Sequence, residues 1–233
     1  MLLDAHSHIL PSIDDGAKTE AESLRLISML KSQGVEALIA TPHFYVSRYR
    51  FEDYYQKVKT TFEKIKKTVA PFPLFLGFEV KYFAGITDYP HLKKLTLGGS
   101  GYMLLELDWS GITENSIKEI AVFKEKTGIT PILAHIERYG FYENYSLAVR
   151  LVEDGKALAQ LTADSILSGV NKVQAAKLLA ARRYSLLGSD THSVVGRPPH
   201  IGDVYKSPEI SESVGFKQIE KFSGRLFAEM QKD

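Results

Sequence analysis

Cysteine is absent from the 233-residue sequence. Its absence excludes disulfide bonds, cysteine-ligated zinc sites and a cysteine nucleophile. Any enzymatic activity of this chain therefore proceeds without a thiol, and any metal site has to use nitrogen and oxygen ligands.

An excess of charge of one sign is also missing, since 29 Lys and Arg stand against 28 Asp and Glu, for a net charge of +1. The two signs are interspersed, so the sequence lacks the basic stripe that is typical of nucleic-acid-binding proteins. No apolar run approaches the roughly 20 residues of a membrane span, and no signal-peptide pattern is visible at the start. We expect a cytoplasmic protein that binds no nucleic acid and does not insert into a membrane.

Short apolar segments alternate with amphipathic ones along most of the chain, a pattern that predicts parallel strands joined by helices. The length and the 44% hydrophobic content suffice for one sizeable core, so we expect a single domain over residues 1–233. The predicted strands are Leu2–Ala5, Ala37–Thr41, Leu74–Glu79, Tyr102–Leu107, Pro131–Ala134, Ala157–Leu161 and Tyr184–Gly188. The predicted helices span residues 19–33, 51–69, 114–127, 144–154, 170–182 and 213–231. Seven strands in one series predict an α/β barrel, with a doubly wound open sheet as the alternative.

Histidines and carboxylates stand at the ends of the predicted strands. His6 and His8 follow the first strand, and their spacing places both imidazoles on one side of an extended chain, where they can chelate one cation. Asp190 and His192 repeat this spacing near the far end of the sequence. The other candidate ligands at strand ends are His43, Glu79, Glu106 and His135. Because the carboxyl ends of parallel strands meet on one face of such a fold, these residues predict a shared metal site.

The loop after the first strand adds an oxygen ligand to this set. Of its two carboxylates, we favour Asp15 as the ligand and Asp14 as the cap of the turn. Nine candidate ligands exceed what one ion takes, so two or three ions are implied, and imidazoles with carboxylates suit Mn, Fe or Zn. His91 and His200 stand in polar loops and are predicted to lie at the surface, whereas Asp4 either orients a ligand or is a buried structural group.

Two arginines next to these ligands point to a phosphate ester. Arg138 follows His135 by three residues, and Arg197 follows His192 by five. A guanidinium binds two oxygens in fixed geometry and stabilises charge that develops on a phosphoryl group, although a salt bridge to a ligand carboxylate is the alternative role for each. An aryl ester is favoured, because a phenol, with a pKa of about 10, leaves more readily than an alkyl alcohol and no spare general acid is evident.

The candidate residues lie in a series of short motifs. The motifs are His6-Ser-His8 with Asp14-Asp15-Gly16, Thr41-Pro-His43, Gly77-Phe-Glu79, Leu105-Glu106-Leu107, Ala134-His-Ile-Glu-Arg-Tyr139, and Ser189-Asp-Thr-His192 with Gly196-Arg-Pro-Pro199. This set resembles the polymerase-and-histidinol-phosphatase (PHP) superfamily. Within it, the chain is most similar to the manganese-dependent bacterial tyrosine-protein phosphatases of capsule and exopolysaccharide operons, the CpsB/YwqE type. The likeness runs from residue 2 to about residue 199, and the last thirty or so residues carry none of it.

The resemblance implies a distorted (β/α)7 TIM-like barrel of the PHP type that holds three Mn²⁺ ions. One ion would be held by His6, His8, Glu79 and Asp190, a second by Glu79, Glu106 and His135, and a third by Asp15, His43 and His192. Arg138 and Arg197 would bind the phosphate while a metal-bound hydroxide attacks phosphorus. The substrate would be the phosphotyrosine tail of a bacterial tyrosine kinase that controls polysaccharide export. One departure is Gln160-Leu-Thr162, where the family tends to have Gln-hydrophobic-Asn, and it concerns substrate contacts rather than the metals.

Other functions stay open as alternatives. A metal-dependent amidohydrolase uses a similar barrel, but it commonly has a bridging lysine carbamate where this chain has Glu79. A small-molecule phosphatase of the histidinol-phosphate kind shares the metal chemistry. A metal-stabilised binding protein would capture phosphotyrosine without turnover, and phosphate release from a phosphopeptide would exclude it.

Overall fold

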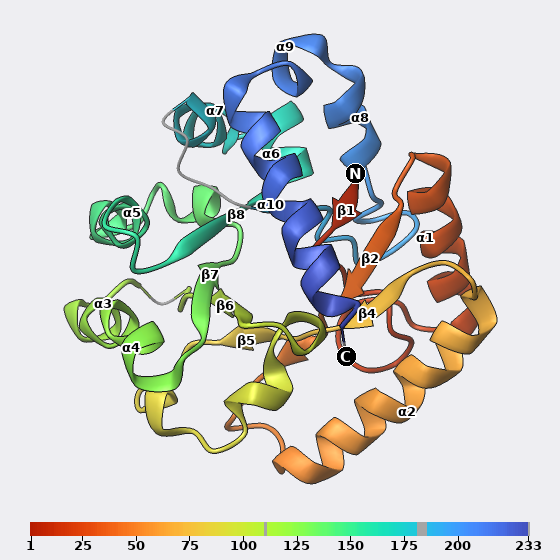
Figure 1. The fold of residues 1–233 in the computed structure, drawn as a ribbon, viewed down its shortest axis with the longest axis horizontal. Helices are drawn as coiled ribbons and strands as arrows, with labels where there is room; N and C mark the ends of the chain where they lie inside the picture. Colours follow the sequence, from red (N-terminus) through yellow and green to blue (C-terminus); the bar gives the residue numbers. More distant parts are fainter. Residues whose placement is uncertain (110, 181–185, 233) are drawn as a thin grey trace.

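The computed structural model describes residues 1–109, 111–180 and 186–232. Its centre is a set of short parallel strands with helices around the outside (Figure 1). The strands are β1 (Leu3–Asp4), β2 (Ala37–Ala40), β3 (His43–Phe44), β4 (Leu74–Leu76), β5 (Glu79–Lys81), β6 (Tyr102–Glu106), β7 (Thr130–Leu133), β8 (Leu158–Thr162) and β9 (Leu186–Gly188). Every strand pairing is parallel, as the alternation of strands and helices predicts.

The strands form two hydrogen-bonded ladders, in the orders β1-β2-β4 and β3-β5-β6-β7-β8-β9. The predicted strand Ala37–Thr41 ends one residue early and resumes as β3, because Pro42 has no N–H to donate to a ladder. The predicted strand Leu74–Glu79 divides likewise into β4 and β5. The N–H of Ala5 donates to the carbonyl of Leu187 at 3.2 Å, so β9 lies beside β1 and the parallel sheet is curled. This curl does not fit a doubly wound open sheet.

Helices follow most of the strands. They are α1 (Glu20–Ser32), α2 (Phe51–Val69), α3 (Glu114–Ala121), α4 (Phe123–Thr127), α5 (Tyr145–Glu153), α6 (Ala163–Leu167), α7 (Lys172–Ala180), α8 (Ile201–Lys206), α9 (Pro208–Ser211) and α10 (Val214–Met230), with 3-10 turns η1 (Ile86–Asp88), η2 (Leu92–Leu95), η3 (Leu97–Gly99) and η4 (Ile136–Tyr139). The predicted helix over 114–127 is broken at Val122 into α3 and α4. The sequence did not predict α6, α8 and α9, because helices this short show no apolar period. The end of the predicted helix over 170–182 and the first two residues of the predicted strand Tyr184–Gly188 lie outside the described residues. Within the described ranges, no helix is long and apolar enough to cross a membrane.

The long helix α10 closes the amino-terminal end of the sheet. Figure 1 shows it across the middle of the fold, over the strands. Phe222, Leu226 and Met230 lie on its inner face and belong to one buried cluster with inward-facing strand residues such as Leu104 and Leu186. The carboxylate of Glu229 accepts a hydrogen bond from the N–H of Gly101, just before β6 begins, at 2.9 Å. The opposite, carboxyl-terminal end of the sheet is therefore the open one.

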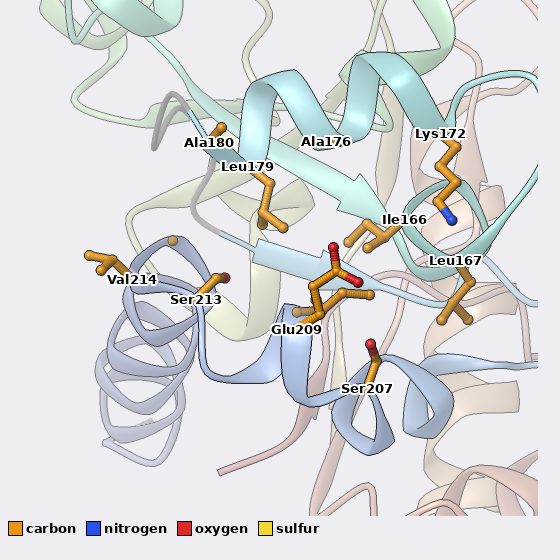
Figure 2. A pocket seen from close by; sticks show the side chains of 12 residues that line it. Ile166, Leu167, Lys172, Ala176, Leu179, Ala180, Ser207, Glu209, Ser213 and Val214 are labelled. Carbon is orange, nitrogen blue, oxygen red and sulfur yellow. The ribbon is translucent and has the colours of Figure 1, made fainter.

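An apolar cavity of about 510 Å³ lies between α6, α7 and the segment from α9 to α10. Figure 2 shows leucine and isoleucine side chains in it, with the charged groups of Lys172 and Glu209 among them. It contains none of the candidate ligands.

Candidate metal centre

The predicted ligands converge at the carboxyl ends of the strands. They surround a polar cavity of about 220 Å³. Its walls include most of the candidate ligands and both predicted arginines: Asp15, His43, Glu79, Glu106, His135, Arg138, Asp190, His192 and Arg197. His6 and His8 lie beneath this cavity and are fully buried. All nine candidate ligands and both arginines are thus brought to one place.

The two histidines after β1 point at each other, as their spacing predicts. The Nε2 atoms of His6 and His8 are 3.1 Å apart. Oε2 of Glu79 lies 3.2 Å from the first and 3.3 Å from the second, and Oδ1 of Asp190 lies 3.4 and 3.3 Å from the same two nitrogens. Four donor atoms that face a common centre at these separations can surround a single cation.

Two further groups extend the cluster on either side. Nε2 of His135 lies 2.9 Å from Oε1 of Glu79 and 3.9 Å from Oε1 of Glu106. On the other side, Oδ1 of Asp15 lies 3.4 Å from Nε2 of both His43 and His192. His8 belongs to this last group as well, since its ligand atoms and those of Asp15, His43 and His192 all lie within 4.8 Å of one another. Glu79 thus contacts both the group of His6, His8 and Asp190 and the group of His135 and Glu106. A carboxylate in this position can bridge two ions.

Several polar atoms of this cluster are buried without a hydrogen-bond partner. They are Nδ1 of His43, Oε2 of Glu79, Oε2 of Glu106 and Nδ1 of His135. Two of these atoms are carboxylate oxygens held by ion-pair contacts alone: Oε2 of Glu79 lies 2.9 Å from Nδ1 of His43, and Oε2 of Glu106 lies 3.5 Å from Nζ of Lys81. Cations bound in this cluster would neutralise such buried carboxylates, and the donor set of imidazoles and carboxylates fits Mn, Fe or Zn.

The electrostatics of the buried side chains agree with this interpretation. Although burial by itself lowers the pKa of His6, the carboxylates of Glu79 and Asp190 raise it above its usual range. The pKa values of Glu79 and Asp190 are held well below their usual range by the neighbouring imidazoles, against the opposing effect of burial. The pKa of His8 is raised as well, chiefly by Asp14 and against the effect of burial. The charge pattern around His6 and His8 thus favours positive charge there, which cations would supply on binding.

Two candidate ligands adopt left-handed backbone conformations. The φ angle is 32° at His135 and 52° at Asp190. A residue other than glycine pays roughly 1–3 kcal/mol for such a conformation. In both cases, the backbone turns sharply at a strand end and aims the side chain into the cluster, so the strain is concentrated at the candidate site.

Outside the ligand cluster, the side chains of Asp14 and Gln160 hold ligands in place. Oδ2 of Asp14 lies 2.8 Å from Nδ1 of His8, and Oδ1 of Asp14 accepts the N–H of Gly16, so Asp14 orients a ligand as well as capping the turn. Oε1 of Gln160 lies 3.0 Å from Nδ1 of His6 and accepts the backbone N–H of His135. Contacts of this kind fix which imidazole nitrogen is free to bind a metal.

Asp4, for which two roles were open, is a structural group. It is fully buried, and its carboxylate accepts hydrogen bonds from the N–H and the hydroxyl of Ser189 at 2.8 and 2.6 Å. Burial raises its pKa to about 6, although these hydrogen bonds oppose the shift. Asp4 thus fastens the loop that carries Asp190.

Both arginines bind a carboxylate of the candidate ligand set in this structure. NH1 of Arg138 and NH2 of Arg197 lie 2.6 and 2.5 Å from Oδ2 of Asp190. The other oxygen of the same carboxylate, Oδ1, faces His6 and His8. One carboxylate thus holds both guanidinium groups against the cavity while its second oxygen stays directed at the imidazoles.

The remaining predictions concern residues outside the cavity. His91 stacks on Phe51 with ring centroids 4.0 Å apart, and His200 pairs with Asp164 at 2.9 Å, so neither reaches the site. Thr162, the position that departs from the family pattern, is buried and does not line the cavity. Its backbone N–H donates to Oε1 of Glu137 at 3.1 Å, and the effect of this departure on substrate contacts stays a prediction.

Comparison with known proteins agrees with these features. The family model for capsular polysaccharide synthesis proteins, CpsB/CapC, matches residues 2–223. The chain belongs to this family. It is 30% identical to tyrosine-protein phosphatase CpsB of Streptococcus pneumoniae over 88% of each chain. It is 29% identical to tyrosine-protein phosphatase YwqE of Bacillus subtilis, over 85% of this chain and 80% of the relative.

Solved structures show the same fold. A chain from the crystal structures of the metal-dependent tyrosine phosphatases YwqE and CpsB matches with a TM-score of 0.81 at 24% identity, over 100% of this chain and 95% of the other. An amidohydrolase from Bifidobacterium longum matches with a TM-score of 0.56 at 12% identity, over 97% of this chain and 98% of the other. This CpsB/CapC chain therefore has a mixed α/β fold with amidohydrolase-like neighbours.

Proposed function

We propose that this chain is a metal-dependent protein-tyrosine phosphatase. The observation that carries the proposal is the single cavity in which imidazoles, carboxylates and two arginines meet at the carboxyl ends of the strands. Membership of a family whose relatives bear the name tyrosine-protein phosphatase supports the reaction. The absence of cysteine excludes the thiol chemistry by which such esters could otherwise be cleaved.

We assign the ligands to three ions. His6, His8, Glu79 and Asp190 would hold one, Glu79, Glu106 and His135 a second, and Asp15, His43 and His192 a third, with Mn²⁺ as the ion and Fe or Zn as alternatives. The short distances between donor atoms within each group support this division. Nδ1 of His43 lies 2.9 Å from Oε2 of Glu79, so His43 borders the second group as well. Ions bound there would lower the pKa of a water molecule and neutralise charge on the phosphoryl oxygens.

The arginines perform the part of the reaction that the chain itself supplies. Asp190 already holds Arg138 and Arg197 together at the cavity wall, so their N–H groups are positioned before a substrate binds. A phosphoryl group that enters the cavity would accept hydrogen bonds from both, and charge-assisted bonds of this kind strengthen as charge builds up in the transition state. Because the groups are preorganised, little reorganisation is needed during the reaction.

The cavity is of a size that admits a side chain rather than a protein surface, at about 220 Å³. We propose that the natural substrate is the phosphotyrosine tail of a bacterial tyrosine kinase of capsular or exopolysaccharide synthesis, and that both act in the cytoplasm. The capsular polysaccharide description of the family supports this partner.

We also propose that residues 1–233 form one domain whose curled sheet is a distorted (β/α)7 barrel. β2 with β3, and β4 with β5, would then each count as one bent strand. The hydrogen bond from Ala5 to Leu187, which brings β9 beside β1, supports closure of such a barrel. The covering of its amino-terminal end by α10 supports a single unit.

Metal removal tests the proposed reaction. Chelation should abolish hydrolysis of a phosphotyrosine peptide, added Mn²⁺ should restore it, and iodoacetamide should have no effect. Phosphoserine peptides of the same sequence, histidinol phosphate and acyl amides should be turned over much more slowly. Full activity in metal-stripped protein, or faster turnover of histidinol phosphate or an amide than of phosphotyrosine, would overturn the proposal.

A further inference from the structure

The only tryptophan in the sequence, Trp109, lies at the mouth of the candidate site. It follows Glu106 by three residues, in the segment after β6, and its side chain is 40% exposed. It lines the cavity together with Arg138 and Arg197. A large, partly exposed aromatic surface beside a strongly polar cavity is suited to a ligand that has a charged end and a flat apolar body.

Trp109 is held rigidly by its neighbours. Its indole N–H donates to Oε1 of Glu106 at 2.5 Å. The indole stacks on the rings of Tyr139 and His135, with centroids 4.8 and 5.5 Å away and interplanar angles of 23° and 24°. Tyr139 is itself fully buried, and its hydroxyl donates to the carbonyl of Leu107 at 3.0 Å. A ring that is fixed in advance loses little conformational entropy when a ligand stacks on it.

A second aromatic ring stands at the other side of the cavity. Tyr45 follows β3, lines the cavity and lies 5.2 Å from the ring of His43. In the ladder, β5 lies between β3 and β6, so Glu79, at the start of β5, is flanked by the strands that precede Tyr45 and Trp109. The guanidinium of Arg48 lies over the Tyr45 ring at 4.3 Å from its centroid, and Nζ of Lys81 lies over the Trp109 ring at the longer distance of 5.8 Å. Trp109 also has the support of Tyr139 and His135. Trp109 is therefore the better candidate for contact with a substrate ring.

We propose that Trp109 selects aromatic phosphate esters by stacking on the phenyl ring of phosphotyrosine while Arg138 and Arg197 bind the phosphate. This inference rests on the proposed phosphatase function and names the residue that gives it substrate specificity. A phosphoserine side chain has no ring and gains nothing from this contact. Stacking acts equally on the bound substrate and the transition state, so its loss should raise KM and leave kcat nearly unchanged.

The single tryptophan allows this contact to be observed directly by fluorescence. The Mn²⁺-loaded chain is titrated with a peptide that carries a non-hydrolysable phosphonate analogue of phosphotyrosine. The indole emission should change saturably, whereas inorganic phosphate and the matching phosphoserine analogue should leave it nearly constant. If calorimetry shows that the phosphotyrosine analogue binds and the emission does not change, the stacking contact is wrong.

Two substitutions separate stacking from the hydrogen bond to Glu106. Trp109→Phe keeps an aromatic ring and loses the N–H, whereas Trp109→Leu loses both. We expect the Leu variant to lower the kcat/KM ratio of phosphotyrosine over phosphoserine peptide roughly tenfold through KM, and the Phe variant to stay within about twofold of the native ratio. A loss shared by both substrates, or a fall in bound Mn²⁺, would instead report the missing bond to Glu106.

The matched control is Phe141→Leu, which removes another exposed aromatic residue, outside the cavity walls. It should change neither the ratio nor the emission. An unchanged ratio in the Leu variant of Trp109 would overturn the inference. Failure of the native chain to hydrolyse any phosphotyrosine peptide would instead refute the proposed function, and the fluorescence titration would still decide whether Trp109 contacts the ring.

Discussion

The two ends of the curled sheet are built from opposite kinds of interaction. At the amino-terminal end, Leu226 of α10 packs with strand residues such as Leu104 in an apolar cluster whose members are almost completely buried. At the carboxyl-terminal end, charged side chains are buried side by side, several polar atoms have no hydrogen-bond partner, and His135 and Asp190 adopt strained backbone conformations. The free energy of unfolding should therefore depend mainly on the amino-terminal end of the sheet, and catalysis on the carboxyl-terminal end. Substitutions at the two ends can test this difference.

The largest effect is expected from removing the carboxylate shared by the candidate metal groups. Glu79→Ala should lower kcat/KM by more than about 10³-fold, because several kcal/mol of charge stabilisation are lost and about 1.4 kcal/mol corresponds to a factor of ten. Bound metal, measured by atomic emission, should fall as well. His91→Ala, outside the cavity, is the control and should be nearly silent. Equal activity and metal content in the two variants would show that the ligand assignment is wrong.

The next largest effect is expected on the free energy of unfolding, from a substitution at the amino-terminal end of the sheet. Leu226→Ala should lower the free energy of unfolding by about 3 kcal/mol, within the usual range for a buried leucine, as measured by urea denaturation. Val214→Ala on the same helix, 55% exposed, should change it by less than about 0.5 kcal/mol. The kcat of the folded Leu226 variant should remain native. A large loss of kcat would mean that the two ends are not independent.

The smallest of the three effects is expected from the arginines. Arg138→Ala and Arg197→Ala should each lower kcat/KM roughly 10²-fold, the usual cost of losing one transition-state donor, with bound metal unchanged. Arg150→Ala, an exposed arginine on α5, serves as the control. Loss of metal in either cavity variant would indicate that the arginines act only by holding Asp190, and a native kcat/KM would exclude contact with the phosphate.

Several elements of the fold could be predicted from local patterns. The helix predicted over residues 51–69 is α2, Phe51–Val69, because its apolar period is regular over nineteen residues. Predictions failed where a local pattern is short or absent. The helices α6, α8 and α9 span only four to six residues each. The covering role of α10 was also not predicted, because an amphipathic pattern identifies a buried face without naming what it packs against.

The candidate site divides in the same way. Eight of its nine candidate ligands could be proposed because parallel strands bring their carboxyl ends to one face. Asp15 was proposed from the loop after the first strand, and the two arginines from their short spacing to His135 and His192. Gln160 and Trp109 could not be selected in this way. Gln160 contacts His6 and His135 from another strand, and the contact of Trp109 with Glu106 depends on the orientation of the indole ring. The available signals were the single tryptophan, three residues after a candidate ligand, and the place of Gln160 in the segment that resembles the family pattern.

Residue types and their order were sufficient to exclude thiol chemistry, to predict alternating strands and helices, and to select the donor atoms. The distances between those atoms depend on how far the sheet curls and on the strand register, which no local pattern encodes. Oδ2 of Asp190 meets both arginines, and Oδ1 faces His6 across more than 180 residues of sequence. Such an arrangement arises only when packing of the whole sheet and its helices compensates the cost of burying the charges and straining the backbone.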